Sequence, residues 1–162
     1  MMDSAPISQF LESTYPDPPL PLTSDFGREI ENKTFALLSP ALYSLLTPRE
    51  LAVLSPRSEE YFRRTREAFL GHRVEDLLNP EKEEELKKAV DEGIGTIGEL
   101  LQTHRADGPF VLGARPTYTD FFIAGSLEFV KLLDHELFSG MVKHPGYGEL
   151  YDACQQYMEQ KD

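Results

Sequence analysis

The chain has 162 residues and a mass of 18.4 kDa, a length that favours one packing unit over a two-lobed enzyme. Hydrophobic residues make up 40% of it and charged residues 27%, and the mean hydropathy is −0.39, which argues against a membrane protein and against a disordered tail. Its 16 basic and 28 acidic residues give a net charge of −12, so nucleic acid and anionic membrane surfaces are not expected as partners.

The first predicted element is a short helix near the amino end. Ser4 or Asp3 stands where a helix cap is expected, Pro6 falls in the first turn, and apolar residues follow within residues 7–11. Four prolines between residues 15 and 22 then predict an extended connector, because proline fixes its own backbone and restricts the residue before it. Everything after this connector is expected to pack as a separate unit.

Apolar residues three and four apart then predict amphipathic helices over 26–38 and 61–69. Prolines at positions 40, 48 and 56 interrupt the pattern between them, where Thr47 is expected to cap a single short turn through Leu51 and Leu54. A longer helix is predicted from Pro80 to about Thr103. Acidic residues crowd its first turn, and its apolar stripe comprises Leu86, Val90, Ile94, Ile97 and Leu101.

Two further helices complete the predicted bundle. Thr117-Tyr118-Thr119-Asp120 matches a capping box, which explains Asp120 as a cap without a catalytic role. The helix that it opens is apolar nearly all round as far as Leu133 and is predicted to be the buried central helix. The last helix starts near His144. Since no run alternates with a period of two for long enough to build a sheet, the predicted fold class is all-α.

Residues 93–98, Gly-Ile-Gly-Thr-Ile-Gly, satisfy the letters of a dinucleotide-binding fingerprint. That motif works only where a buried strand ends and a helix begins, because its glycines bring free helix amides to the pyrophosphate. Here the preceding residues form a charged helical run. We therefore interpret these glycines as points where a neighbouring segment approaches the helix closely, and no nucleotide cofactor is expected.

Neither the histidines nor the cysteine predict a reactive or metal-binding centre. None of His72, His104, His135 and His144 stands at the spacing that places two metal ligands on one helical face. His135 is expected at a helix end, interacting with free carbonyls. Cys154, the single cysteine, cannot form an internal disulfide and lies on an apolar stripe, so a buried, inert thiol in a reducing, cytoplasmic protein is predicted.

Two stretches carry a resemblance to a known family. Residues 3–12, followed by Tyr15-Pro16, resemble the end of the thioredoxin-like first domain of glutathione transferases. Residues 108–113, followed by residues 116–120, are similar to the segment that leads into the core helix of that family, and fungal members resemble the chain most. The resemblance implies a remnant of the thioredoxin-like domain and a linker over residues 1–22, and a helical domain like the family's C-terminal domain over residues 23–162.

The same resemblance implies a site. Glutathione is expected as the co-substrate, with Asp3 and Ser4 holding its γ-glutamyl end, and no metal is expected. The residue that activates the thiol in the family would precede Met1, so no catalytic residue is assigned. The side chains predicted to line an apolar substrate pocket are Phe26, Ile30, Tyr43 and Tyr118.

Two hypotheses about function follow from the resemblance. The first is an enzyme that acts on a hydrophobic, electrophilic small molecule by glutathione conjugation or glutathione-dependent cis–trans isomerisation, in fungal secondary metabolism, once the missing N-terminal region is supplied. The second is a non-catalytic helical module for binding or dimerisation, left after loss of the catalytic domain. The resemblance also implies a homodimer, because the family's third and fourth helices contribute to its dimer interface, so a second copy could cover the exposed apolar face of residues 5–11.

Overall fold

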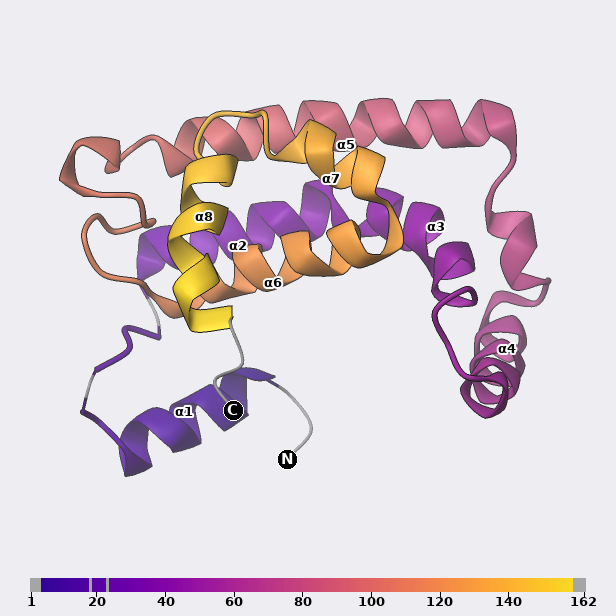
Figure 1. Cartoon of the computed structure of the whole chain (residues 1–162), viewed down its shortest axis with the longest axis horizontal. Helices are drawn as coiled ribbons and strands as arrows, with labels where there is room; N and C mark the ends of the chain where they lie inside the picture. The colour runs from indigo at the N-terminus through magenta and orange to yellow at the C-terminus, as the bar shows by residue number, and fades with distance from the viewer. Residues whose placement is uncertain (1–3, 18, 23, 159–162) are drawn as a thin grey trace.

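Residues 4–17, 19–22 and 24–158 are described by a computed structural model, and within them the chain is built from α-helices (Figure 1). These are α1 (Ser4–Thr14), α2 (Asp25–Leu37), α3 (Ser39–Glu50), α4 (Pro56–Leu70), α5 (Pro80–Leu101), α6 (Tyr118–Leu133), α7 (His135–Met141) and α8 (Tyr147–Met158). Two short 3₁₀ helices lie between them, η1 (Val74–Leu77) and η2 (Arg105–Asp107). The described residues contain no β-strand, only an isolated bridge between Phe110 and Gly113, so the all-α prediction is confirmed.

Local signals in the sequence set several helix ends. The Asn79 side chain accepts a hydrogen bond from the Lys82 amide (2.8 Å) at the start of α5, as a helix cap does. Pro80 occupies the first position, where its missing amide hydrogen leaves no bond unmade. A different signal ends α4. Its C-cap residue, Gly71, has a φ of 75°, a left-handed conformation that residues with a side chain disfavour. The Asn79 cap and the position of Pro80 confirm the predicted start of the long helix, α5.

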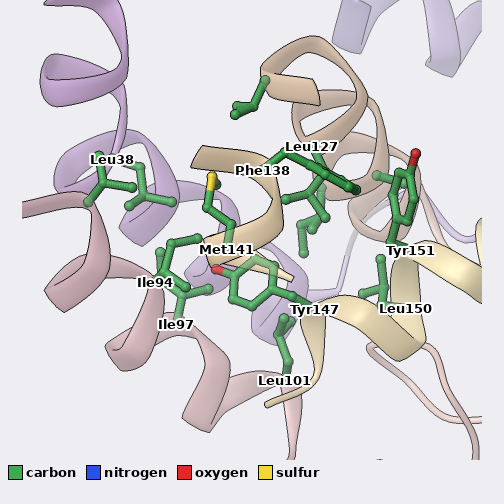
Figure 2. Close-up of a cluster of buried hydrophobic side chains, with 14 of the residues drawn as sticks. Leu38, Ile94, Ile97, Leu101, Leu127, Phe138, Met141, Tyr147, Leu150 and Tyr151 are labelled. Atoms are coloured by element: carbon green, nitrogen blue, oxygen red, sulfur yellow. The ribbon is translucent and has the colours of Figure 1, made fainter. Parts of the chain in front are cut away.

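The core lies between the long helix α5 and the helices that pack on it and on α6. Helix α5 contacts α2, α3 and α7, while α6 contacts α2, α3, α7 and α8. In Figure 2, Ile94 and Ile97 of α5 face Met141 and Tyr147 across the core. Burying each such aliphatic side chain contributes about 1.5–3 kcal/mol relative to leaving it in water.

The predicted break between residues 40 and 56 is wrong in part, because α3 runs through Pro48 to Glu50. Thr47 does not cap a turn. It is buried inside α3, where Leu45 and Leu46 are also buried in the core. Pro48 removes only one hydrogen bond, two residues before the helix ends, and burial of the apolar face of α3 offsets that loss.

Helix α6 occupies the predicted central place but is not buried all round. Its Ile123 and Leu127 side chains are fully buried, whereas Phe129 is 45% exposed and Leu132 66% exposed. Phe122, Gly125, Phe129 and Leu132 are three or four residues apart, so they share one side of the helix, which we call the α6 stripe. The prediction of a buried central helix therefore holds for one side of α6, whereas an apolar stripe on its other side meets solvent in this chain.

The expected role of His135 at a helix C-terminus is also wrong. His135 is the first residue of α7, which follows α6 almost without a gap. Asp134 separates the two helices and accepts a hydrogen bond from the Leu137 amide (2.9 Å), so it caps the start of α7. The His135 ring instead lies beside Ser139 Oγ at 3.3 Å.

The two outlying helices are α1 and α4, which lie at opposite ends of the bundle in Figure 1. On α1, Ile7, Phe10 and Leu11 are 41%, 57% and 48% exposed, as expected for a helix without its partner. The described residues of α4 include none that is buried, and this helix packs on η1. The core thus lies among the other six α-helices of the described chain, and the proposed domain boundary after residue 22 stays a prediction.

The glycines of residues 93–98 lie inside α5, and their interpretation as close-approach positions is confirmed for Gly93 and Gly98. A Cβ atom at Gly93 would lie 2.8 Å from Leu38 Cδ2, and one at Gly98 would lie 2.8 Å from the Pro145 carbonyl oxygen. Gly95 is different, because the nearest atom to its added Cβ, His144 Nδ1, is 3.9 Å away.

This difference predicts opposite effects of the same substitution within one turn of α5. Gly98→Ala should destabilise the chain by about 1–3 kcal/mol, because a backbone carbonyl cannot move away as a flexible side chain can. Gly95→Ala should leave stability unchanged or raise it by about 1 kcal/mol through helix propensity. Urea unfolding of both variants checks this. Equal stability of the two would contradict the close packing at Gly98.

Candidate functional site

An apolar groove of about 440 Å³ lies between α3 and α6. Helix α3 contributes residues 39–50 to one wall and α6 contributes residues 122–130 to the other. The lining side chains are Ser39, Leu42, Tyr43, Leu46, Thr47 and Glu50 from α3, and Phe122, Gly125, Ser126, Phe129 and Val130 from α6. Aromatic rings over an aliphatic floor make this groove suited to a flat or elongated apolar molecule.

Helical spacing brings these residues to one side of each helix. On α3, Leu42, Leu46 and Glu50 are four residues apart, and on α6 Phe122, Gly125 and Phe129 are three and four apart. Gly125 leaves the middle of the groove open, because an added Cβ there would meet no atom within 4 Å. Three members of the α6 stripe therefore form one wall of the groove.

The polar groups of the groove are few. The Ser126 hydroxyl donates to the Phe122 carbonyl oxygen (2.8 Å), so its proton is already used. Glu50 stands at the end of α3, where burial raises the pKa of its carboxyl and the Arg66 guanidinium of α4 opposes that rise. The groove thus offers apolar contacts and one carboxyl, that of Glu50, whose pKa depends on its surroundings. This set of groups suits binding of a ligand more than bond-breaking chemistry.

Asp120 fixes the start of the helix that carries this wall. Its carboxylate is fully buried and accepts three hydrogen bonds of 2.7 Å, from the Val111 amide, the Thr117 amide and the Thr117 hydroxyl. Burial raises the pKa of Asp120, and these hydrogen bonds oppose the rise. The capping box predicted from the sequence is confirmed, with the carboxylate also tying the 110–113 turn to α6.

Only one of the four predicted pocket residues lies in this groove. Tyr43 lines it, whereas Ile30 is fully buried in the core. Phe26, half-buried, packs edge-to-face on His104 with ring centroids 5.5 Å apart, and the Tyr118 amide donates to the Pro21 carbonyl oxygen (3.0 Å). Phe26 and Tyr118 therefore lie at the starts of α2 and α6, away from the residues that line the groove.

The sequence reasoning did not select Phe122 and Phe129, although their helix was singled out. The composition of the helix did indicate that some of its apolar residues would be exposed, because a helix that is apolar all round has more apolar surface than one core can cover. The spacing alone does not say which side stays open.

The predicted glutathione-binding residues fall at the edge of the described chain. Asp3 lies outside the described residues. Ser4 is the first residue of α1, and its side chain is outside the described part. Their assignment stays a prediction.

The described residues lack the features of three other kinds of site. They contain no group of three or more His, Cys, Asp or Glu side chains arranged to hold a metal ion. None of their helices has the length and apolar character required to cross a bilayer. Cys154 is fully buried, and burial raises the pKa of its thiol to about 12, so this sulfur is protonated and shielded rather than nucleophilic.

Comparison with protein families adds a finding about residues 28–141, which match the family model described as the glutathione S-transferase C-terminal domain. The glutathione S-transferase-like protein ustS of Aspergillus flavus is 33% identical over an alignment that covers 98% of this chain and 61% of the relative. The chain therefore spans less than two thirds of that relative's length.

Solved structures of fungal glutathione transferases share the fold. GSTFuA3 of Phanerochaete chrysosporium superposes with a TM-score of 0.81 at 25% identity, over 99% of this chain and 66% of that one. A glutathione S-transferase of Ceriporiopsis subvermispora, solved in complex with glutathione, superposes with a TM-score of 0.84 at 28% identity, over 99% and 67%.

The buried thiol gives a test of this packing. At about pH 8, iodoacetamide should modify Cys154 in the folded chain at least about a hundredfold more slowly than in concentrated urea, because the folded thiol is both protonated and covered. Mass spectrometry at timed intervals measures the two rates. Comparable rates in the two conditions would show that Cys154 is not in the core.

Proposed function

Because the chain belongs to the glutathione S-transferase family, we propose that it holds a hydrophobic electrophile for reaction with glutathione. The observation that carries the proposal is the aromatic groove between α3 and α6. Phe129 and Tyr43 in its walls are 45% and 39% exposed, so they can still cover the apolar surface of a bound ligand.

The chemistry proposed is addition of the glutathione thiolate to an electrophilic carbon. In conjugation, the sulfur forms a bond to that carbon, and either a leaving group departs with the bonding pair or a proton is taken up at the neighbouring atom. In the isomerisation variant, thiolate addition turns a conjugated double bond into a single bond, rotation follows, and expulsion of the thiolate restores the alkene without consuming glutathione. Cys154 supplies no nucleophile for either route, since it is buried.

Glutathione would be held in part by the start of α1. Asp3 and Ser4 are proposed to bind its γ-glutamyl carboxylate and amine, since a helix N-terminus stabilises a carboxylate. The neighbour solved with glutathione supports this choice of co-substrate. Because the chain spans 61% of its Aspergillus relative, the activity of the whole protein is part of the proposal. From the resemblance to fungal members of the family, we also propose a role in secondary metabolism and a cytoplasmic location.

A non-catalytic module is the second candidate, and the exposed side of α1 favours it. Ile7, Phe10 and Leu11 present apolar surface that a second copy of the chain could cover. Sedimentation of the 162-residue chain as a dimer without any glutathione-dependent conjugation would favour this candidate over the enzyme.

The groove predicts how aromatic substitutions change binding of an electrophile. Phe129→Ala should weaken binding of chlorodinitrobenzene about tenfold, because one wall loses its ring. Phe69→Ala removes an aromatic ring that is 82% exposed on α4, outside the groove, and should leave the affinity unchanged. Titration followed by nuclear magnetic resonance measures both variants. If the two weaken binding equally, the groove is not the site.

The start of α1 gives a separate prediction for glutathione. Ser4→Ala should weaken glutathione binding by about 1–3 kcal/mol, as when a charged ligand group loses a hydrogen-bond partner. The matched control is Ser13→Ala near the other end of α1, where the exposed hydroxyl donates to the Phe10 carbonyl oxygen (2.8 Å). Calorimetry of the 162-residue chain measures both. Absence of heat and of a thermal shift at millimolar glutathione would reject the enzyme proposal for this chain.

A further inference from the structure

A second, smaller hollow of about 110 Å³ lies beside the groove and reaches into the core. We call it the inner chamber, and its buried wall includes Leu38, Leu127, Met141 and Tyr147. Leu42 and Phe122 line both the groove and the inner chamber, so the two hollows are adjacent. A molecule in the groove that passed between these two side chains would enter the core.

The Tyr147 hydroxyl is the unusual group of this chamber. The residue is only 2% exposed, yet its hydroxyl makes no hydrogen bond to any described residue. In Figure 2 the oxygen points from α8 towards Met141 and Ile94, away from the edge of the bundle. Buried hydroxyls are nearly always hydrogen-bonded, so this one is placed to receive a partner that the protein itself does not provide.

Two of the other hydroxyls that line the chamber already donate hydrogen bonds, and the third, that of Ser39, belongs to a residue only half-buried at the start of α3. Thr34 Oγ1 donates to the Ile30 carbonyl oxygen (2.8 Å), and Ser126 Oγ donates to the Phe122 carbonyl oxygen (2.8 Å). Tyr147 thus differs from both in having its proton free for a ligand. Burial raises the pKa of Tyr147, so the phenol stays protonated at physiological pH and acts as a donor.

The walls favour an organic group over water as the partner. A buried water needs two to four polar partners, whereas most of the side chains that line the inner chamber are apolar. At about 110 Å³ the inner chamber is smaller than the apolar cavity of roughly 150 Å³ that holds benzene, so it is suited to part of a ring or to a short branched chain, with the rest of the ligand in the groove.

We propose that the inner chamber receives the apolar end of a ligand that carries one carbonyl or ether oxygen, and that this oxygen accepts a hydrogen bond from Tyr147. Calling this ligand the substrate rests on the proposed function of the groove. Tyr147 would then be a specificity-determining residue, since it selects between molecules of equal shape by the presence of one acceptor.

The test uses acetophenone and cumene, which have similar shapes but differ in the carbonyl group. Each is titrated, without glutathione, into the 162-residue chain with labelled methionine methyl groups. Met141 lines the chamber and reports on it, while Met158 near the end of α8 lies outside it and serves as the internal control. Acetophenone should shift the Met141 signal and bind about five- to tenfold more tightly than cumene.

Tyr147→Phe removes only the hydroxyl. The affinity for acetophenone should fall to that for cumene, and the melting temperature should not fall, because no hydrogen bond within the described chain is lost. Tyr151→Phe is the matched control on the same helix. The Tyr151 hydroxyl donates to Glu128 and accepts from Lys131 Nζ (2.8 Å), so this variant should lose stability and keep the preference for acetophenone.

Four results would overturn the proposal: equal binding of the two probes, a preference that survives in Tyr147→Phe, shifts at Met158 without Met141, or no binding of either probe. A crystal soaked with acetophenone that showed only an undisplaced water on Tyr147 would also overturn it. Since the probes are not electrophiles for conjugation and glutathione is absent, this test and the glutathione titration fail independently.

Discussion

The buried carboxylate of Asp120 is the interaction on which the arrangement of the site depends. It accepts three hydrogen bonds of 2.7 Å, one from Val111 in the 110–113 turn and two from Thr117, the residue that precedes α6. These bonds hold the turn and Thr117 against the start of the helix. A buried carboxylate without those donors would strongly destabilise the fold, so the residue at which α6 begins is fixed by these bonds. The α6 wall of the groove and the α6 stripe take their position from that start, and so does the packing of Leu127 in the core.

Local chemistry explains what the sequence could predict. The capping box at Thr117, the helix start at Pro80 and the close-approach glycines all follow from backbone requirements of a few neighbouring residues. The path of α3 through Pro48 did not follow, because it depends on burial against α5, which local propensity does not contain. Burial of α6 was overestimated for a related reason: periodicity shows that a surface is apolar, but not whether the same chain covers it.

The residues of the candidate site likewise fall into those that the sequence could predict and those that it could not. Tyr43 was predicted and lies in the groove, whereas the core position of Ile30 reflects the usual destination of an aliphatic residue on the inner side of a helix. The lack of a partner for the Tyr147 hydroxyl could not be inferred from sequence at all, because a tyrosine on an apolar stripe commonly finds an acceptor. The family resemblance supplied glutathione as the expected co-substrate, and the structure supplied the solvent-facing groove between α3 and α6.

Helix α4 has a consequence for the groove although it lines none of it. It is held to η1 by the Arg63–Glu75 ion pair (2.6 Å) and buries no residue, so it belongs to the part of the chain with the least resistance to local unfolding. Yet Arg66 of this helix is the cation that acts on Glu50 at the groove. Without α4 in place, the burial that raises the pKa of the Glu50 carboxyl would lose the guanidinium that opposes it, so a helix outside the groove helps to set the charge of the groove.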